Sequence, residues 1–115
     1  FASTLMPHIH IIGDACTASP MPKSAFAASS QAKACAVAVV ADLQGRPVPS
    51  PTLINTCYSL VTPEEAVSVV GVYKVQNNQM VSVSGGETPI AADWREEARY
   101  AQNWRDTVSS YSFGD

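Results

Sequence analysis

Hydrophobic and polar residues alternate over the short segment 8–12, which reads His-Ile-His-Ile-Ile and stops at a Gly-Asp dipeptide. Such alternation with a period of two, ended by turn residues, predicts a β-strand. Over residues 23–43 the pattern changes, because alanine dominates and neither proline nor glycine interrupts the stretch. Alanine has the highest helix propensity, and Gly45 and Pro47 supply a stop. The first part of the chain is therefore predicted to be a strand, a proline-containing loop and a helix.

The second part of the chain predicts a small antiparallel sheet. Residues 52–61, 67–75 and 79–84 are rich in β-branched residues, and Asn77-Asn78 separates the last two segments as a hairpin turn. The dipeptide Gly85-Gly86 is expected to close the third strand.

A final helix is predicted from Asp93, its N-cap, to about Ser109, with Glu96 placed as in a capping box. The prolines of residues 47–51 mark a linker. The expected fold class is α+β, with a first domain part at residues 1–46 and a second domain at residues 47–115.

Composition narrows the class of protein. The chain has 115 residues, of which 46% are hydrophobic and 15% charged, so it holds enough apolar material for one core. A net charge of −3 without a basic cluster argues against nucleic acid as a partner. No apolar run is expected to span a membrane. His8 and His10 share a strand face, but two histidines without further ligands do not predict a metal site.

The chain contains three cysteines, Cys16, Cys35 and Cys57, and their spacing matches no metal site. An odd number leaves at least one thiol without a partner among the three. Two interpretations stay open at this point. The cysteines are buried small hydrophobic residues of a reduced protein, or one of them pairs with a cysteine outside this sequence.

The order strand, Gly-Asp, loop and alanine-rich helix is able to hold a nucleotide cofactor. The carboxylate of Asp14 would accept a hydrogen bond from a hydroxyl, and the N-terminus of the helix presents N–H groups and the positive end of its dipole. An ordinary turn aspartate is the alternative, because a Gly-Asp dipeptide after a strand occurs in many folds.

Several segments together resemble the flavin-binding subunit of flavocytochrome c sulfide dehydrogenase. The resemblance extends to Asp93-Trp94, Trp104 and Phe113-Gly114, and it implies that the sequence is the C-terminal part of that subunit. The segments that carry it are Ile9–Ala15, Pro20–Ser24, Gln31–Lys33 and Asn55–Ser59. The implied fold is the end of an FAD-binding domain followed by a domain like the C-terminal domain of FAD/NAD-linked reductases.

The resemblance also implies roles for single residues. Gly13 and Asp14 match the family's FAD motif, in which the aspartate binds the ribityl chain. Pro22, Lys23 and Ser24 match the segment that starts the helix facing the pyrimidine edge of the flavin.

Cys57 matches one of two cysteines that form a redox-active disulfide beside the flavin, whereas Cys16 and Cys35 are expected to be non-catalytic. By the same resemblance the second redox cysteine lies upstream, together with the site for the adenine half of FAD. Weak or no FAD binding is therefore expected of residues 1–115 alone.

The implied activity is sulfide oxidation, with hydrogen sulfide as substrate and a c-type cytochrome subunit as electron acceptor in the periplasm. Two alternatives stay open. A sulfide:quinone reductase would end in an apolar amphipathic segment, whereas residues 105–115 are polar. The second alternative is a non-catalytic subunit-interface module of a protein like the disulfide reductases, in which Cys57 has no catalytic role.

Overall fold

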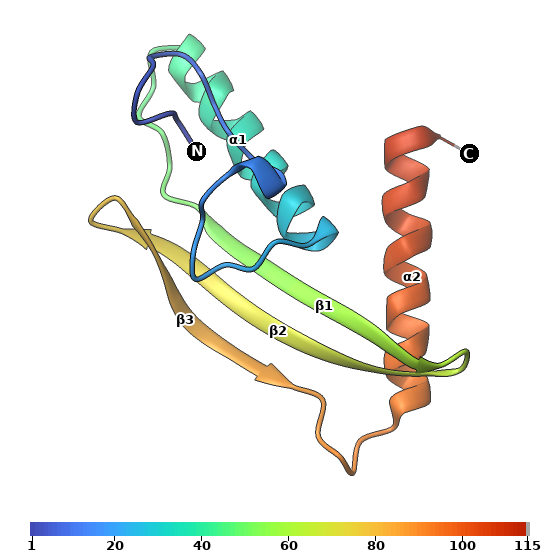
Figure 1. The fold of residues 1–115 in the computed structure, drawn as a ribbon. Helices are drawn as coiled ribbons and strands as arrows, with labels where there is room; N and C mark the ends of the chain where they lie inside the picture. Colours follow the sequence, from blue (N-terminus) through green and yellow to red (C-terminus); the bar gives the residue numbers. More distant parts are fainter. Residues whose placement is uncertain (115) are drawn as a thin grey trace. The chain divides into compact units, whose positions relative to one another are not determined.

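The computed structural model describes residues 1–114 and shows an α+β fold, as predicted. Figure 1 shows the order of its elements, which is a 3₁₀ turn η1 (Gly13–Ala15), helix α1 (Ala25–Leu43), three strands and helix α2 (Trp94–Phe113). The strands β1 (Thr52–Thr62), β2 (Glu65–Gln76) and β3 (Gln79–Glu87) form one sheet in the order β1-β2-β3.

The chain divides into two compact units that share the sheet. The first unit contains residues 1–56 and 70–85, and the second contains the remaining residues from 57–69 and from 86 onward. The domain boundary predicted between residues 46 and 47 follows from the resemblance to a known family, and it stays a prediction.

The strand predicted at residues 8–12 is not formed. This segment makes a single antiparallel bridge between Ala2 and His10, with the N–H of Ser3 bonded to the Ile9 carbonyl at 2.7 Å. His8 has a φ of 63°, outside the extended region. A strand needs a neighbour that pairs over several residues, and the described part of the chain offers this segment only the first three residues. The expectation was therefore wrong for this element, although the turn that follows it is present.

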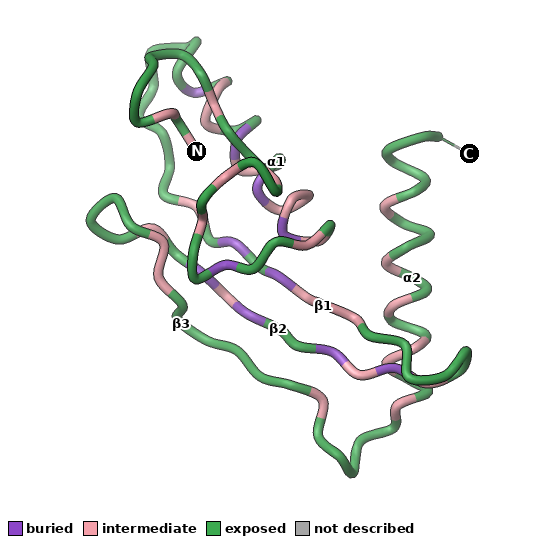
Figure 2. The backbone as a smooth tube through the Cα atoms, viewed as in Figure 1, coloured by how far each residue is buried: buried purple, intermediate pink, exposed green. Residues whose placement is uncertain are grey.

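Helix α1 begins and ends close to where the sequence predicts. The Ser24 side chain accepts a hydrogen bond from the Ala27 N–H as N-cap, and Gly45 follows the end with a φ of 64°. One side of α1 is buried, and Figure 2 marks its buried stretches in purple. The buried residues of α1 are Ala27, Gln31, Cys35 and Ala41.

Helix α1 is also long and apolar enough to cross a membrane by length and composition alone. Helices in protein cores meet the same measure, so it assigns no membrane span. Only part of this apolar stretch is buried. Ala27, near its start, belongs to a buried cluster with Met21, Leu53 and Tyr73.

The sheet forms where β-branched residues predict it. Asn77 and Asn78 have φ values of 51° and 59°, and both values place these residues in the left-handed region of a tight hairpin turn. Strand β3 continues through Gly85 and Gly86, which were expected to end it.

The alternation of buried residues along β2 changes phase. Ala66 and Ser68 are buried at its start, whereas Gly71 and Tyr73 are buried further on. Side chains alternate between the two faces of a strand, so even positions are covered first and odd positions afterwards. The change falls at the border between the two units.

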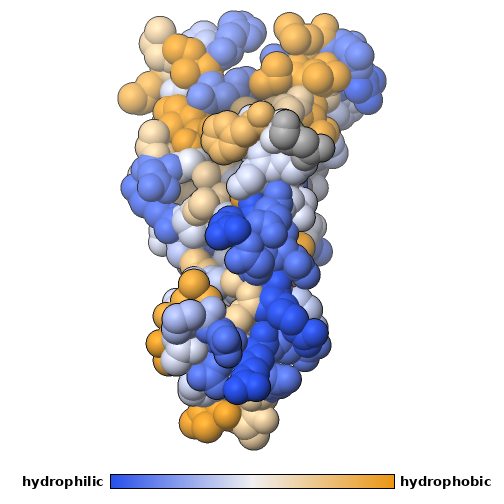
Figure 3. All heavy atoms as spheres, turned by 90° about the vertical axis from the view of Figure 1, so that its right-hand side faces the viewer, coloured by the Kyte–Doolittle hydropathy of each residue, from blue (hydrophilic) through white to orange (hydrophobic). Residues whose placement is uncertain are grey.

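Helix α2 begins as predicted, because the Asp93 carboxylate accepts a hydrogen bond from the Arg95 N–H at 3.0 Å. It runs four residues beyond the expected end, to Phe113. Hydrophilic residues follow much of its visible side in Figure 3. Along α2, half-buried residues recur at helical spacing, so they lie on one side of the helix. These residues are Trp94, Glu97, Ala98, Ala101, Trp104 and Val108.

Candidate functional site

The five residues matched to FAD binding lie around one small hollow in the first unit. The hollow has a volume of about 10 Å³, which is room for about one water molecule. The hollow itself is therefore too small to enclose a flavin ring. The predicted residues in its lining are Gly13, Asp14, Pro22, Lys23 and Ser24.

Gly13 is held in its turn by a buried glutamine. Its φ is 68°, a conformation that favours glycine. Its N–H donates to Oε1 of Gln31 at 2.8 Å, and Nε2 of Gln31 lies 3.6 Å from the Met21 sulfur. Gln31 has only 3% of its surface exposed, so its carboxamide is committed to these contacts. Sequence reasoning placed Gln31 in a family-like segment but gave it no role.

Asp14 and Lys23 meet through the backbone. The Lys23 ammonium donates to the main-chain carbonyl of Asp14 at 2.6 Å. The Asp14 carboxylate is exposed, and it takes part in no hydrogen bond or ion pair among residues 1–114. A hydroxyl-bearing ligand would find this acceptor unused, with a positive charge fixed near it.

Ser24 joins the start of α1 to β1. Its Oγ accepts from the Ala27 N–H at 3.0 Å and donates to Oδ1 of Asn55. Asn55 is almost fully buried, with 1% of its surface exposed. A second contact runs from the Ile54 N–H to Oγ of Ser30 at 3.2 Å. The helix end predicted to face a cofactor is therefore fixed to one strand by side-chain hydrogen bonds.

Cys57 lies on that same strand and is half-buried. It follows Asn55 by two residues, so the two side chains share a face of β1. All three cysteines carry reduced thiols, with Cys35 buried and Cys16 half-buried. No disulfide links these three cysteines.

Tyr58 lies within the electrostatic influence of a charge that the sequence did not indicate. Burial raises the pKa of Tyr58, and the negative charge of Glu97 raises this pKa further. One carboxylate oxygen of Glu97, Oε2, is buried without a hydrogen-bond partner among the described residues. These two residues tie β1 to α2 within the second unit, and only the packing of the helix against the strand brings them together.

The histidines of the N-terminal segment do not converge on a metal centre. Nδ1 of His8 lies 3.9 Å from Oδ2 of Asp42, with both side chains largely exposed. Among residues 1–114, no group of three or more His, Cys, Asp or Glu residues is arranged to hold a metal ion.

A family model matches a large part of this chain. The family model described as flavocytochrome c sulphide dehydrogenase, flavin-binding, matches residues 49–113. The match therefore covers more than half of the 115 residues. It includes β1 with Cys57, the rest of the sheet and α2, whereas the hollow around Gly13 lies outside it.

Proposed function

Because the chain belongs to the flavin-binding family of flavocytochrome c sulphide dehydrogenases, we propose that it contributes FAD contacts and a redox-active cysteine to sulfide oxidation. The observation that supports this most directly is the convergence on one hollow of the two segments, Gly13-Asp14 and Pro22–Ser24, that resemble the family's FAD-binding segments. Ser24 is bonded to Asn55 of β1.

The residues of the hollow are suited to the hydroxyl-rich chain and ring edge of FAD. The Asp14 carboxylate is an exposed acceptor for a ribityl hydroxyl. The Lys23 ammonium is bonded to the main-chain carbonyl of the same residue, and the capped N-terminus of α1 adds the positive end of a helix dipole. The Gly13 turn is fixed by Gln31 and keeps this surface in place. With the adenine half held by an upstream part of the subunit, residues 1–115 alone would bind FAD weakly.

We assign Cys57 as one of two redox-active cysteines, with its partner supplied by an upstream part of the subunit. Hydrosulfide would attack one sulfur of that disulfide, so that a new S–S bond forms as a persulfide and the old one breaks. The electron pair of the broken bond leaves with the other cysteine as a thiolate. The chemistry that a bound FAD supplies is two-electron uptake from sulfur and one-electron release to the haem of a c-type cytochrome. Such a system would operate in the periplasm.

The test uses the intact flavoprotein subunit with its cytochrome. Cys57→Ser should retain FAD absorbance but lose sulfide-dependent reduction of the cytochrome, whereas Cys35→Ser, at a cysteine outside the hollow, should keep both. Asp14→Ala should lower the amount of FAD that stays bound after gel filtration.

Full sulfide-dependent activity in Cys57→Ser would overturn the role of the cysteine. Unchanged FAD content in Asp14→Ala would overturn the cofactor site. Both results together would leave a non-catalytic interface module.

A further inference from the structure

A buried glutamine of α1 lies behind the FAD hollow of the first unit. Only 3% of the surface of Gln31 is exposed, and both polar atoms of its carboxamide are engaged. Oε1 accepts from the Gly13 N–H at 2.8 Å, and Nε2 lies 3.6 Å from the Met21 sulfur. Burying a carboxamide costs free energy that an apolar side chain of similar size would not cost. The polar group therefore does more at this position than fill space.

Gln31 connects the two segments that resemble the family's FAD-binding segments. Gly13 and Asp14 belong to the turn η1, whereas Met21 immediately precedes Pro22–Ser24. The bond to Gly13 spans 18 residues of sequence. One side chain, fixed on a regular helix, thus contacts the backbone of the first segment and the residue that leads into the second.

The bond from Gln31 restrains a turn that has little to restrain it otherwise. The turn η1 has three residues, and no side chain caps its first residue. Gly13 has a φ of 68°, and glycine leaves this region for others at little cost. The Lys23 ammonium also reaches the turn, through the Asp14 carbonyl, but that bond is exposed to water. The buried bond from Gln31 is therefore the stronger restraint on the conformation of Gly13.

We propose that Gln31 is a positioning residue for FAD. It holds the Gly13 turn, and with it the Asp14 carboxylate, in the orientation that a ribityl hydroxyl requires. This inference rests on the proposed function, in which Asp14 contacts FAD. Gln31 lines the hollow, but its carboxamide is committed to other residues of the chain, so it acts through the turn. Without this bond, FAD would have to order the turn as it binds, which lowers affinity.

The test measures the Kd for FAD of the intact flavoprotein subunit, prepared free of FAD, by quenching of flavin fluorescence. Gln31→Leu keeps a similar volume but removes the acceptor, so the Kd should rise about three- to tenfold. Gln31→Met, whose flexible side chain fits irregular core space, also lacks the acceptor and should give the same rise. Circular dichroism checks that each FAD-free variant folds.

The control for core packing is Met21→Leu. It removes the weak sulfur acceptor and conserves volume, while the bond from Gln31 to Gly13 stays. The Kd of this variant should change by less than about twofold.

A double-mutant cycle with Asp14 separates positioning from general damage. If Gln31 acts only through the turn that holds Asp14, Gln31→Leu should raise the Kd by less than about twofold in an Asp14→Ala background. Damage to the fold would instead raise the Kd by the same factor in both backgrounds.

Three results would overturn the positioning role while Asp14→Ala still weakens FAD binding. They are an unchanged Kd in both Gln31 variants, equal factors in the two backgrounds of the cycle, and a rise in Met21→Leu as large as that in Gln31→Leu. An unchanged Kd in Asp14→Ala would be a different result, because it would overturn the cofactor site itself and this inference with it.

Discussion

The hydrogen bond between Ser24 and Asn55 gives the sharpest test of how α1 is fixed to β1. Ser24→Ala removes the N-cap of α1, which costs about 1 kcal/mol in the free energy of unfolding. It also removes the hydrogen bond from the Ser24 hydroxyl to Asn55, which contributes about 0.5–1.5 kcal/mol. The expected total is about 1.5–2.5 kcal/mol, and the urea midpoint should fall by about 1 M.

A double-mutant cycle separates the two terms. Asn55→Leu removes the same hydrogen bond from the strand side. The combined Ser24→Ala/Asn55→Leu variant should be less destabilised than the sum of the single variants by about 1 kcal/mol, because both remove one shared contact. Ser109→Ala, at an exposed position of α2, is the matched control and should change stability by less than about 0.5 kcal/mol.

Urea unfolding followed by circular dichroism measures the unchanged protein, the three variants of the cycle and the control. Additive effects in the cycle would refute the shared contact. A Ser24→Ala effect as small as that of the control would refute the cap as well.

Three further predictions concern the sheet and α2. Gly71→Ala should lower the free energy of unfolding by about 1–3 kcal/mol in urea titrations, because the new Cβ would clash with the buried ring of Tyr73. In the control Gly86→Ala, the new Cβ meets no atom within 4 Å, so this variant should lose less stability. The pKa of Tyr58 is raised in the folded state, so the stabilisation from this tyrosine is present below about pH 10 and is lost as the pH rises through the folded pKa. Glu97→Gln should lower the pKa of Tyr58, measured by ultraviolet titration with Tyr58→Phe as the reference. An unchanged pKa would contradict the influence of the Glu97 charge. Asp93→Ala should cost about 1 kcal/mol by thermal or urea unfolding, because α2 loses its N-cap; unchanged stability would contradict that role.

The sequence alone determined the elements whose causes are local. Alanine content and the stop at Gly45 specify α1, β-branched residues specify the three strands, and the Asn77-Asn78 pair specifies the hairpin turn between the last two. Each of these depends on propensity or on contacts a few residues away, which a single sequence displays. The resemblance to a flavoprotein family likewise came from short segments, and the family match at residues 49–113 confirmed it.

Only the tertiary structure decided which distant residues meet. Gln31 supports the Gly13 turn and Asn55 receives the Ser24 hydroxyl, contacts that span 18 and 31 residues. The segment 8–12 has the pattern of a strand but forms only a bridge, because a strand also needs a partner that pairs over several residues.

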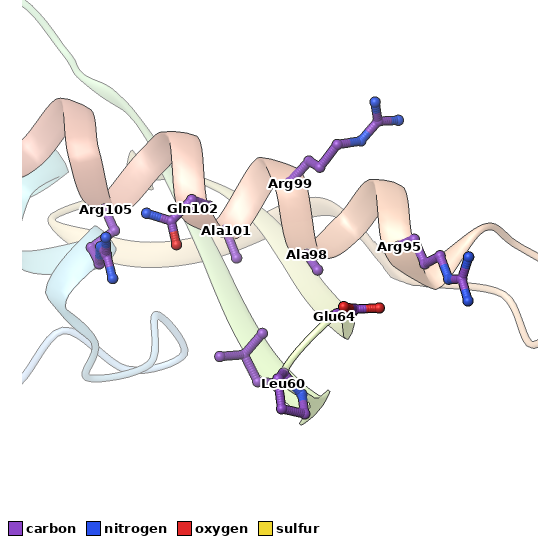
Figure 4. A pocket seen from close by; sticks show the side chains of 9 residues that line it. Leu60, Glu64, Arg95, Ala98, Arg99, Ala101, Gln102 and Arg105 are labelled. Atoms are coloured by element: carbon purple, nitrogen blue, oxygen red, sulfur yellow. The ribbon is translucent and has the colours of Figure 1, made fainter.

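A groove between the β1–β2 turn and α2, within the second unit, shows the same limit (Figure 4). Its arginines, Arg95, Arg99 and Arg105, look like ordinary exposed residues along the chain, and their common position follows from how α2 lies against that turn. Local propensity depends on residues that are neighbours in the sequence. Buried hydrogen bonds, covered strand faces and grooves depend instead on which surfaces from distant parts of the sequence pack together.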